Sequence, residues 1–117
     1  MIHIVDCETL KQWIASNQVN IIDVREQSEY NETNIDGSTL IPLGQIDFEK
    51  VQKIANNGKK TVIHCRSGAR SLKACQILME YDESLEVYNL EGGIIAWNNM
   101  NKSCQSSSCS IGGCNVK

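Results

Sequence analysis

The sequence predicts an α/β fold, in which a parallel sheet lies between layers of helices. Short apolar runs rich in β-branched residues, typical of buried strands, occur at residues 2–5, 19–24 and 61–64. Stretches whose apolar residues repeat at helical spacing separate these runs. Strands that alternate with helices favour a parallel sheet with helices on both of its faces.

The other elements follow from the same spacing and from the turn residues between them. Asp6 is a suitable N-cap for the first helix, in which Leu10, Trp13 and Ile14 share one face. Pro42 is expected to stop a brief strand, and the Asn-Asn-Gly at residues 56–58 to end a helix. We expect the remaining elements at residues 28–32 (helical turn), 39–41 (strand), 48–55 (helix), 72–80 (helix), 85–88 (strand) and 94–97 (helix).

Composition and charge exclude several classes of function. The chain is 41% hydrophobic and 21% charged, as in an ordinary globular domain, and its formal net charge of -3 argues against a basic nucleic-acid binder. No stretch is apolar over the length that crosses a membrane, and the N-terminus lacks the basic and apolar regions of a signal peptide. We therefore expect a cytoplasmic monomer that binds neither nucleic acid nor membranes.

The loop that follows the strand at residues 61–64 carries the strongest functional signal. Its sequence is Cys65-Arg66-Ser67-Gly68-Ala69-Arg70-Ser71, and a helix begins within it. Unpaired N–H groups and the positive end of the dipole at a helix start stabilise an anion and favour the thiolate of a cysteine. We expect the loop amides to face a thiol that is open to water.

Each residue type in this loop suits the binding of an anion beside a reactive thiol. Glycine permits a tight curve, backbone amides can surround a sulfur atom, and arginines attract and hold an anionic donor. We therefore expect Cys65 to be the nucleophile and the substrate to be bound by Arg66, Ser67, Gly68, Ala69 and Arg70. No metal or organic cofactor is expected, because a thiolate suffices for exchange of sulfur between two partners.

Four short segments occur in an order and at a spacing that match a known family. They are Asp23-Val24-Arg25-Glu26, Ile35-Asp36-Gly37-Ser38 with Ile41-Pro42, the loop from Cys65 to Ser71, and Glu91-Gly92-Gly93 with Ala96-Trp97. On these segments the chain from about residue 4 to 97 resembles a single-domain rhodanese, a sulfurtransferase. Asn34 and Ser38 depart from the histidine and the small apolar residue that the family usually has, but both lie away from the loop.

The resemblance implies both a fold and an activity. The implied fold is a rhodanese-like three-layer sandwich, with a five-stranded parallel sheet flanked by helices. The implied activity is transfer of a sulfane sulfur, from a donor such as thiosulfate to cyanide, a thiol or a protein, through a persulfide on Cys65. An alternative is a persulfide carrier or interaction module with little turnover of small molecules.

A phosphatase or an arsenate reductase is a further alternative, which the loop length disfavours. Four residues, Arg66 to Ala69, separate Cys65 from Arg70, one fewer than in the tyrosine-phosphatase signature. The shorter loop favours a sulfur atom over a phosphoryl group. The loop also lacks an evident general acid for an alkoxide leaving group.

Several nearby residues have structural interpretations. We expect Asp23 and Arg25 to pair and brace the end of the sheet, and Cys75 to be an inert buried thiol. We expect His64 to be a strand residue whose hydrogen bonds are satisfied, and not a proton carrier.

The six cysteines do not indicate a disulfide framework, since a regular helix and strand pattern without an export signal favours a reducing compartment. We expect a rhodanese-like domain at residues 1–100 and a flexible tail at 101–117, rich in serine and cysteine. In the tail Cys104, Cys109 and Cys114 recur as C-x4-C-x4-C, which is not the spacing of common zinc sites. They are either incidental or secondary thiols that accept sulfur from Cys65 or form a disulfide with it.

Overall fold

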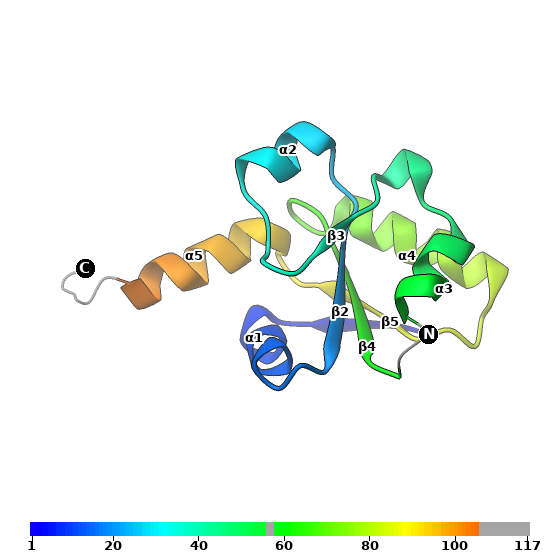
Figure 1. Cartoon of the computed structure of the whole chain (residues 1–117), viewed down its shortest axis with the longest axis horizontal. Helices are drawn as coiled ribbons and strands as arrows, with labels where there is room; N and C mark the ends of the chain where they lie inside the picture. Colours follow the sequence, from blue (N-terminus) through cyan, green and yellow to red (C-terminus); the bar gives the residue numbers. More distant parts are fainter. Residues whose placement is uncertain (56–57, 106–117) are drawn as a thin grey trace.

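The computed structural model describes residues 1–55 and 58–105, with side chains placed up to residue 101, and its strands form a single parallel sheet. The strand order is β1-β5-β4-β2-β3, and Figure 1 shows the helices arranged around this sheet. The strands are β1 (Ile2–Val5), β2 (Val19–Asp23), β3 (Thr39–Leu40), β4 (Lys60–His64) and β5 (Val87–Leu90). The helices are α1 (Cys7–Ala15), α2 (Gln27–Glu32), the short 3-10 helix at Leu43–Gln45, α3 (Phe48–Ala55), α4 (Ala69–Tyr81) and α5 (Gly93–Gln105).

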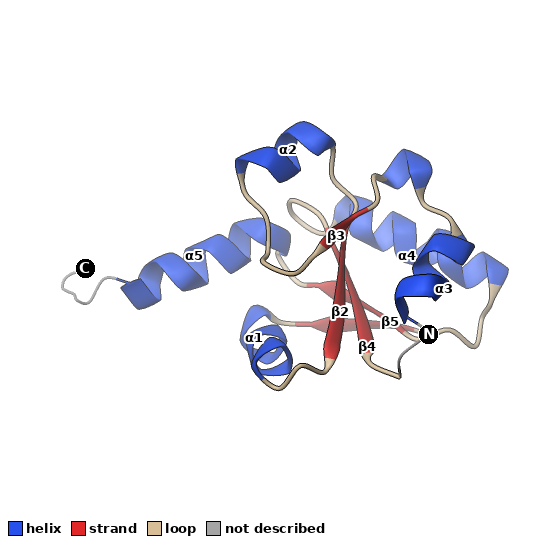
Figure 2. Ribbon diagram, in the orientation of Figure 1, coloured by secondary structure: helices blue, strands red, loops and turns tan. Residues whose placement is uncertain are grey.

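Helices cover both faces of the sheet, as the alternation of elements predicts (Figure 2). On one face, side chains of the strands pack with Val51 of α3 and Leu78 of α4. On the other face they pack with Leu10 of α1 and Ile94 of α5. Successive β4 residues alternate between the two clusters, as the two-residue period of a strand requires. The predicted three-layer arrangement is therefore confirmed.

The last strand and the last helix differ from their expected positions. Strand β5 is Val87–Leu90 rather than residues 85–88, because Leu85 closes a turn by donating its amide to the carbonyl of Asp82 at 3.1 Å. Helix α5 continues to Gln105, past the expected end of the domain at residue 100. The helix end at 56–57, the tail at 106–117 with Cys109 and Cys114, and the side chain of Cys104 lie outside the described residues.

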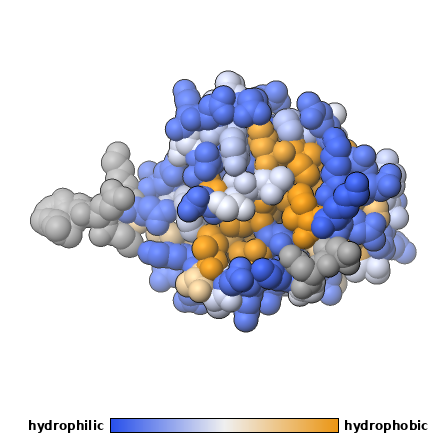
Figure 3. Space-filling view, viewed as in Figure 1, coloured by the Kyte–Doolittle hydropathy of each residue, from blue (hydrophilic) through white to orange (hydrophobic). Residues whose placement is uncertain are grey.

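The edge of the sheet beside β3 leaves apolar residues close to the surface. Strand β3 pairs only with Ile22 and Asp23, so the first half of β2 forms the edge of the sheet. Figure 3 shows the face of the molecule that is also seen in Figure 1. Apolar residues gather across the middle of this face, and hydrophilic residues surround them. Within the described ranges, no helix is both long and apolar enough to cross a membrane.

Candidate functional site

Cys65 lies at the carboxyl end of β4, between β5 and β2. Ligands of parallel sheets bind beyond this end of the strands. The Cys65 sulfur accepts a hydrogen bond from the amide of Gly68 at 3.1 Å, and the Ser71 hydroxyl lies 3.5 Å from it. The loop therefore turns back over the cysteine and directs an amide at its sulfur, as the sequence predicts.

The thiol is much less open than we expected. Cys65 is only 1% exposed, although Arg66, Ser67 and Ala69 around it are exposed. The same tight curve that aims the Gly68 amide at the sulfur also covers it. The expectation of a water-exposed thiol is therefore wrong, and a donor must reach the sulfur past the loop residues.

Gly68 makes the tight curve possible. Its φ of +116° is a left-handed conformation that side chains rarely adopt, and it stands at the N-cap of α4. The start of α4 consequently faces Cys65, so the unpaired amides and the positive dipole end of this helix act on the sulfur.

The beginning of α5 holds the other side of the loop. The amides of Ile94 and Ile95 donate to the carbonyl oxygens of Cys65 at 2.9 Å and Arg66 at 3.2 Å. Gly93 allows this approach, because a Cβ there would lie only 2.4 Å from the Arg66 carbonyl oxygen. With these carbonyls directed at α5, the loop amides that follow are free to face the sulfur. The Gly-Gly segment marks this contact in the sequence, but its role there was not predicted.

Ser71 and Asn89 complete the surroundings of the sulfur, and we did not predict them as site residues. The Ser71 hydroxyl lies within hydrogen-bond distance of the Gly68 carbonyl at 3.1 Å and of the Asn89 Oδ1 atom. The Asn89 amide donates to the same Gly68 carbonyl at 3.3 Å. Ser71 belongs to the predicted loop and could have been found there, whereas Asn89 comes from β5, which only the sheet pairing places beside the loop.

These contacts change the ionisation of Cys65. Burial alone would raise the pKa of the thiol, but hydrogen bonds from the Ser71 hydroxyl and from the amides of Ser71, Gly68 and Ser67 outweigh it, and the pKa lies below its ordinary value. The predicted burial of Cys75 is confirmed, and this burial raises the pKa of its thiol to about 12. Burial also raises the pKa of Cys7. Of these three cysteines, only Cys65 is in surroundings that favour a thiolate.

The two loop arginines have different surroundings. Arg66 is exposed and lines a pocket of about 290 Å³ together with Glu32, Ile94 and Ile95. Arg70 is half-buried and forms a two-bonded ion pair with Glu29 of α2, at 2.7 and 2.9 Å. Arg70 thus has a protein partner in this structure, and its role in binding the substrate stays a prediction.

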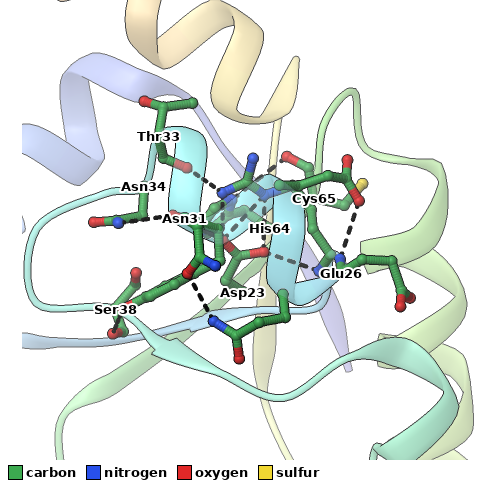
Figure 4. Close-up of polar contacts among 12 residues, drawn as sticks. Asp23, Glu26, Asn31, Thr33, Asn34, Ser38, His64 and Cys65 are labelled. Atoms are coloured by element: carbon green, nitrogen blue, oxygen red, sulfur yellow. Dashed lines mark hydrogen bonds and ion pairs between the residues drawn. The ribbon is translucent and has the colours of Figure 1, made fainter.

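A buried polar cluster lies just behind the loop. The Arg25 guanidinium pairs with the Asp23 carboxylate at 2.7 Å and donates to the Thr33 carbonyl at 2.6 Å, which ties the segment after α2 to the end of β2. Figure 4 shows His64 and Asp23 near Cys65, with Thr33 on the other side of this cluster. The predicted structural pairing of Asp23 with Arg25 is therefore confirmed.

His64 differs from the expectation of a fully satisfied strand residue. Its ring is wholly buried, and within the described part of the chain its Nε2 atom makes no hydrogen bond and lies 3.7 Å from the Asp23 carboxylate. Burial lowers the pKa of His64, and the Asp23 charge opposes this only in part. Within residues 1–55 and 58–101, His, Cys, Asp and Glu side chains form no group that could hold a metal ion.

Comparisons with known proteins agree with the fold and with the resemblance to a rhodanese. The family model described as "Rhodanese-like domain" matches residues 6–100. A "Sulfurtransferase" of Allochromatium vinosum is 37% identical over 98 residues, which span 83% of this chain and 89% of that protein. The "Putative sulfur carrier protein YrkF" of Bacillus subtilis is 35% identical over 80% of this chain and 49% of its own length. The crystal structure of a rhodanese-related protein from Thermoplasma volcanium superposes with a TM-score of 0.68 at 28% identity, covering 84% of this chain and 92% of that one.

Proposed function

Because the chain belongs to the family of rhodanese-like domains, we propose that it is a sulfurtransferase that carries sulfane sulfur as a persulfide on Cys65. The observation that supports this most is the hydrogen bond from the Gly68 amide to the Cys65 sulfur, at 3.1 Å. Such an amide stabilises negative charge on sulfur both before and after transfer.

The first step loads the cysteine. With thiosulfate, the Cys65 thiolate attacks the outer sulfur, a new S–S bond forms, and the bond between the two donor sulfurs breaks. Sulfite leaves with the bonding electron pair and two negative charges, and Cys65 is left as an anionic persulfide. The start of α4 and the Ser71 hydroxyl lie where this anion needs donors.

The second step returns the cysteine to its thiolate form. A nucleophile such as cyanide or a thiolate attacks the outer persulfide sulfur, and the Cys65 thiolate leaves. Neither step changes the overall number of electrons, so exchange between two partners requires no separate oxidant or reductant. The unpaired Cys7, Cys65 and Cys75 suit the reducing conditions of a cytoplasm, where we propose that the protein acts.

Transfer from thiosulfate to cyanide tests this function. We expect repeated turnover to thiocyanate by the native chain and none by Cys65→Ser. Cys75→Ser is the matched control, since that thiol is buried and its pKa is raised to about 12. Thiocyanate formation by Cys65→Ser at the native rate would contradict the proposal.

A persulfide carrier is a second candidate, which the likeness to a putative sulfur carrier protein favours. A carrier would load one sulfur from thiosulfate and then stall until a protein acceptor is added. The same assay separates the two functions, because a carrier gives a single loading event where a small-molecule sulfurtransferase gives continued turnover.

A further inference from the structure

The charge of Arg70 is already neutralised beside the candidate site. Its guanidinium donates to both carboxylate oxygens of Glu29, at 2.7 and 2.9 Å. Hydrogen bonding by Arg70 lowers the pKa of Glu29 to about 2, so this carboxylate is ionised at any neutral pH. A bidentate pair of this kind is geometrically specific and leaves little of the arginine's charge for another anion.

The remaining charges near the loop are mostly negative. The Glu26 carboxylate acts on Arg70 from the start of α2, and Glu32 lines the pocket beside Arg66. Arg25 is turned inward to Asp23 and is only 3% exposed. Of the arginines around this pocket and loop, Arg66 alone is exposed, and it faces α2, which contains two glutamates and has a third at its N-cap.

This distribution disfavours a donor that carries two negative charges. Transfer from thiosulfate brings a dianion to a thiolate, so three negative charges must be held near one exposed arginine. A thiol persulfide brings at most one negative charge, and its protonated form, R–S–SH, brings none. The Cys65 thiolate bonds to its terminal sulfur, the donor's S–S bond breaks, and the RS⁻ that leaves takes up the proton, which gives R–SH and the Cys65 persulfide anion.

On the assumption of the proposed sulfurtransferase function, we propose that Glu29 is a specificity-determining residue that favours persulfides of low charge over dianionic donors. Glu29 acts through Arg70 of α4. The ion pair holds the Arg70 guanidinium against α2, away from an incoming anion. The Glu29 carboxylate also accepts a hydrogen bond from the backbone amide of Glu26 at 3.0 Å, as the N3 residue of a capping box. Glutamine can keep this cap, so Glu29→Gln removes the charge with little change to α2.

The test measures the rate at which Cys65 gains sulfur from two donors, thiosulfate and the persulfide of 2-mercaptoethanol. In Glu29→Gln, we expect the ratio of the thiosulfate rate to the persulfide rate to rise by roughly tenfold at low salt. Added salt should reduce this gain, because it screens charges at the surface. Glu83→Gln, which removes the same charge in the loop between α4 and β5 at the opposite end of the strands, should leave the ratio unchanged. Glu32→Gln should raise it less, since Glu32 lines the pocket but is not the partner of Arg70.

An unchanged ratio in Glu29→Gln, or an equal rise in Glu83→Gln, would overturn the proposal. The native chain supplies a second readout that needs no variant. Its thiosulfate rate should rise with salt, because screening weakens the repulsion between a dianion and the glutamates, and a fall would contradict the role of Glu29. Failure of the native chain to gain sulfur from either donor would contradict the sulfurtransferase function itself, whereas loading with an unchanged ratio contradicts only the role of Glu29.

Discussion

Among the contacts that favour the thiolate form of Cys65, the hydroxyl group of Ser71 acts most strongly. Burial of Cys65 opposes the thiolate, and the hydrogen bond from this hydroxyl is the largest of the contacts that favour it. At the residue scale, the lowered pKa of Cys65 therefore comes from a short list of hydrogen-bond donors and not from exposure to water.

Ser71→Ala should raise the pKa of Cys65, because the thiolate loses its hydroxyl donor while remaining buried. We expect alkylation of Cys65 by iodoacetamide at neutral pH to slow roughly tenfold, and the alkylation profile to move to higher pH. Peptide mapping by mass spectrometry separates Cys65 from the other thiols. Ser84→Ala, a serine in the turn before β5, is the control. Equal alkylation rates in Ser71→Ala and the native chain would show that this hydroxyl does not act on the thiolate.

Site residues could be predicted from the sequence only where their partners lie close by in the chain. Cys65 and Gly68 belong to one loop, and their relation follows from chain order alone. The partners of Arg70 and Ser71 come from α2 and β5, distant in sequence, so local patterns do not reveal them. The burial of Cys65 was missed because chain order predicts that the loop turns towards the sulfur but not how completely the loop covers it.

At the scale of elements, the start of α5 is a support for the loop. Gly93 has a φ of +58°, and its surface touches the backbone of Cys65 and Arg66. Neither a larger side chain nor a shift of α5 can be accommodated without moving the loop carbonyls.

Gly93→Ala should therefore destabilise the domain and disturb the site. The added Cβ meets backbone oxygen and carbon atoms of the loop, which cannot swing away as a side chain end can. We expect a loss of about 2 kcal/mol or more in the free energy of unfolding, measured with denaturant, and slower loading of Cys65. Gly44→Ala is the matched control, because a Cβ there has nothing within 4 Å. If Gly93→Ala unfolds with the same free energy as the native chain, the predicted clash with the loop backbone is wrong.

The ion pair between α2 and α4 should make a small, pH-dependent contribution to stability. Arg70 lowers the pKa of Glu29 from 4.5 to about 2 in the folded state. Because the folded pKa is the lower one, the contribution is present above pH 4.5 and is lost as pH falls towards 2.

Unfolding of the native chain and of Glu29→Gln at several pH values measures this contribution. Partly exposed pairs contribute little, so we expect a difference of about 1 kcal/mol or less at neutral pH that disappears in acid. A difference that stays constant from pH 7 down to pH 2 would show that the loss in Glu29→Gln is not electrostatic.

At the scale of the whole molecule, the sequence predicts the architecture better than its boundaries. Strict alternation of apolar runs with helical segments is enough to specify a parallel sheet covered on two faces. The exact bounds of β5 depend on pairing with β1 and on the turn at Asp82, which a local apolar pattern does not specify. Likewise, the serine- and cysteine-rich composition of residues 101–117 suggested a flexible tail, although helical backbone continues to Gln105.

The tail cysteines give a prediction that concerns the chain as a whole. If Cys104, Cys109 and Cys114 are incidental, replacing all three with serine should leave loading of Cys65 and transfer to a dithiol unchanged. The rate of transfer and non-reducing mass spectrometry measure this. Slower transfer, or loss of a disulfide between the tail and Cys65, would instead assign these thiols a part in the second step.

The central claim is that Cys65 alone carries the transferred sulfur, and the intact mass of the protein tests it most directly. After incubation with a sulfur donor and removal of the excess, the native chain should gain the mass of one sulfur atom. Cyanide should remove this gain, and Cys65→Ser should never acquire it. An unchanged mass of the native chain with both thiosulfate and a thiol persulfide, or an equal gain in Cys65→Ser, would contradict the account.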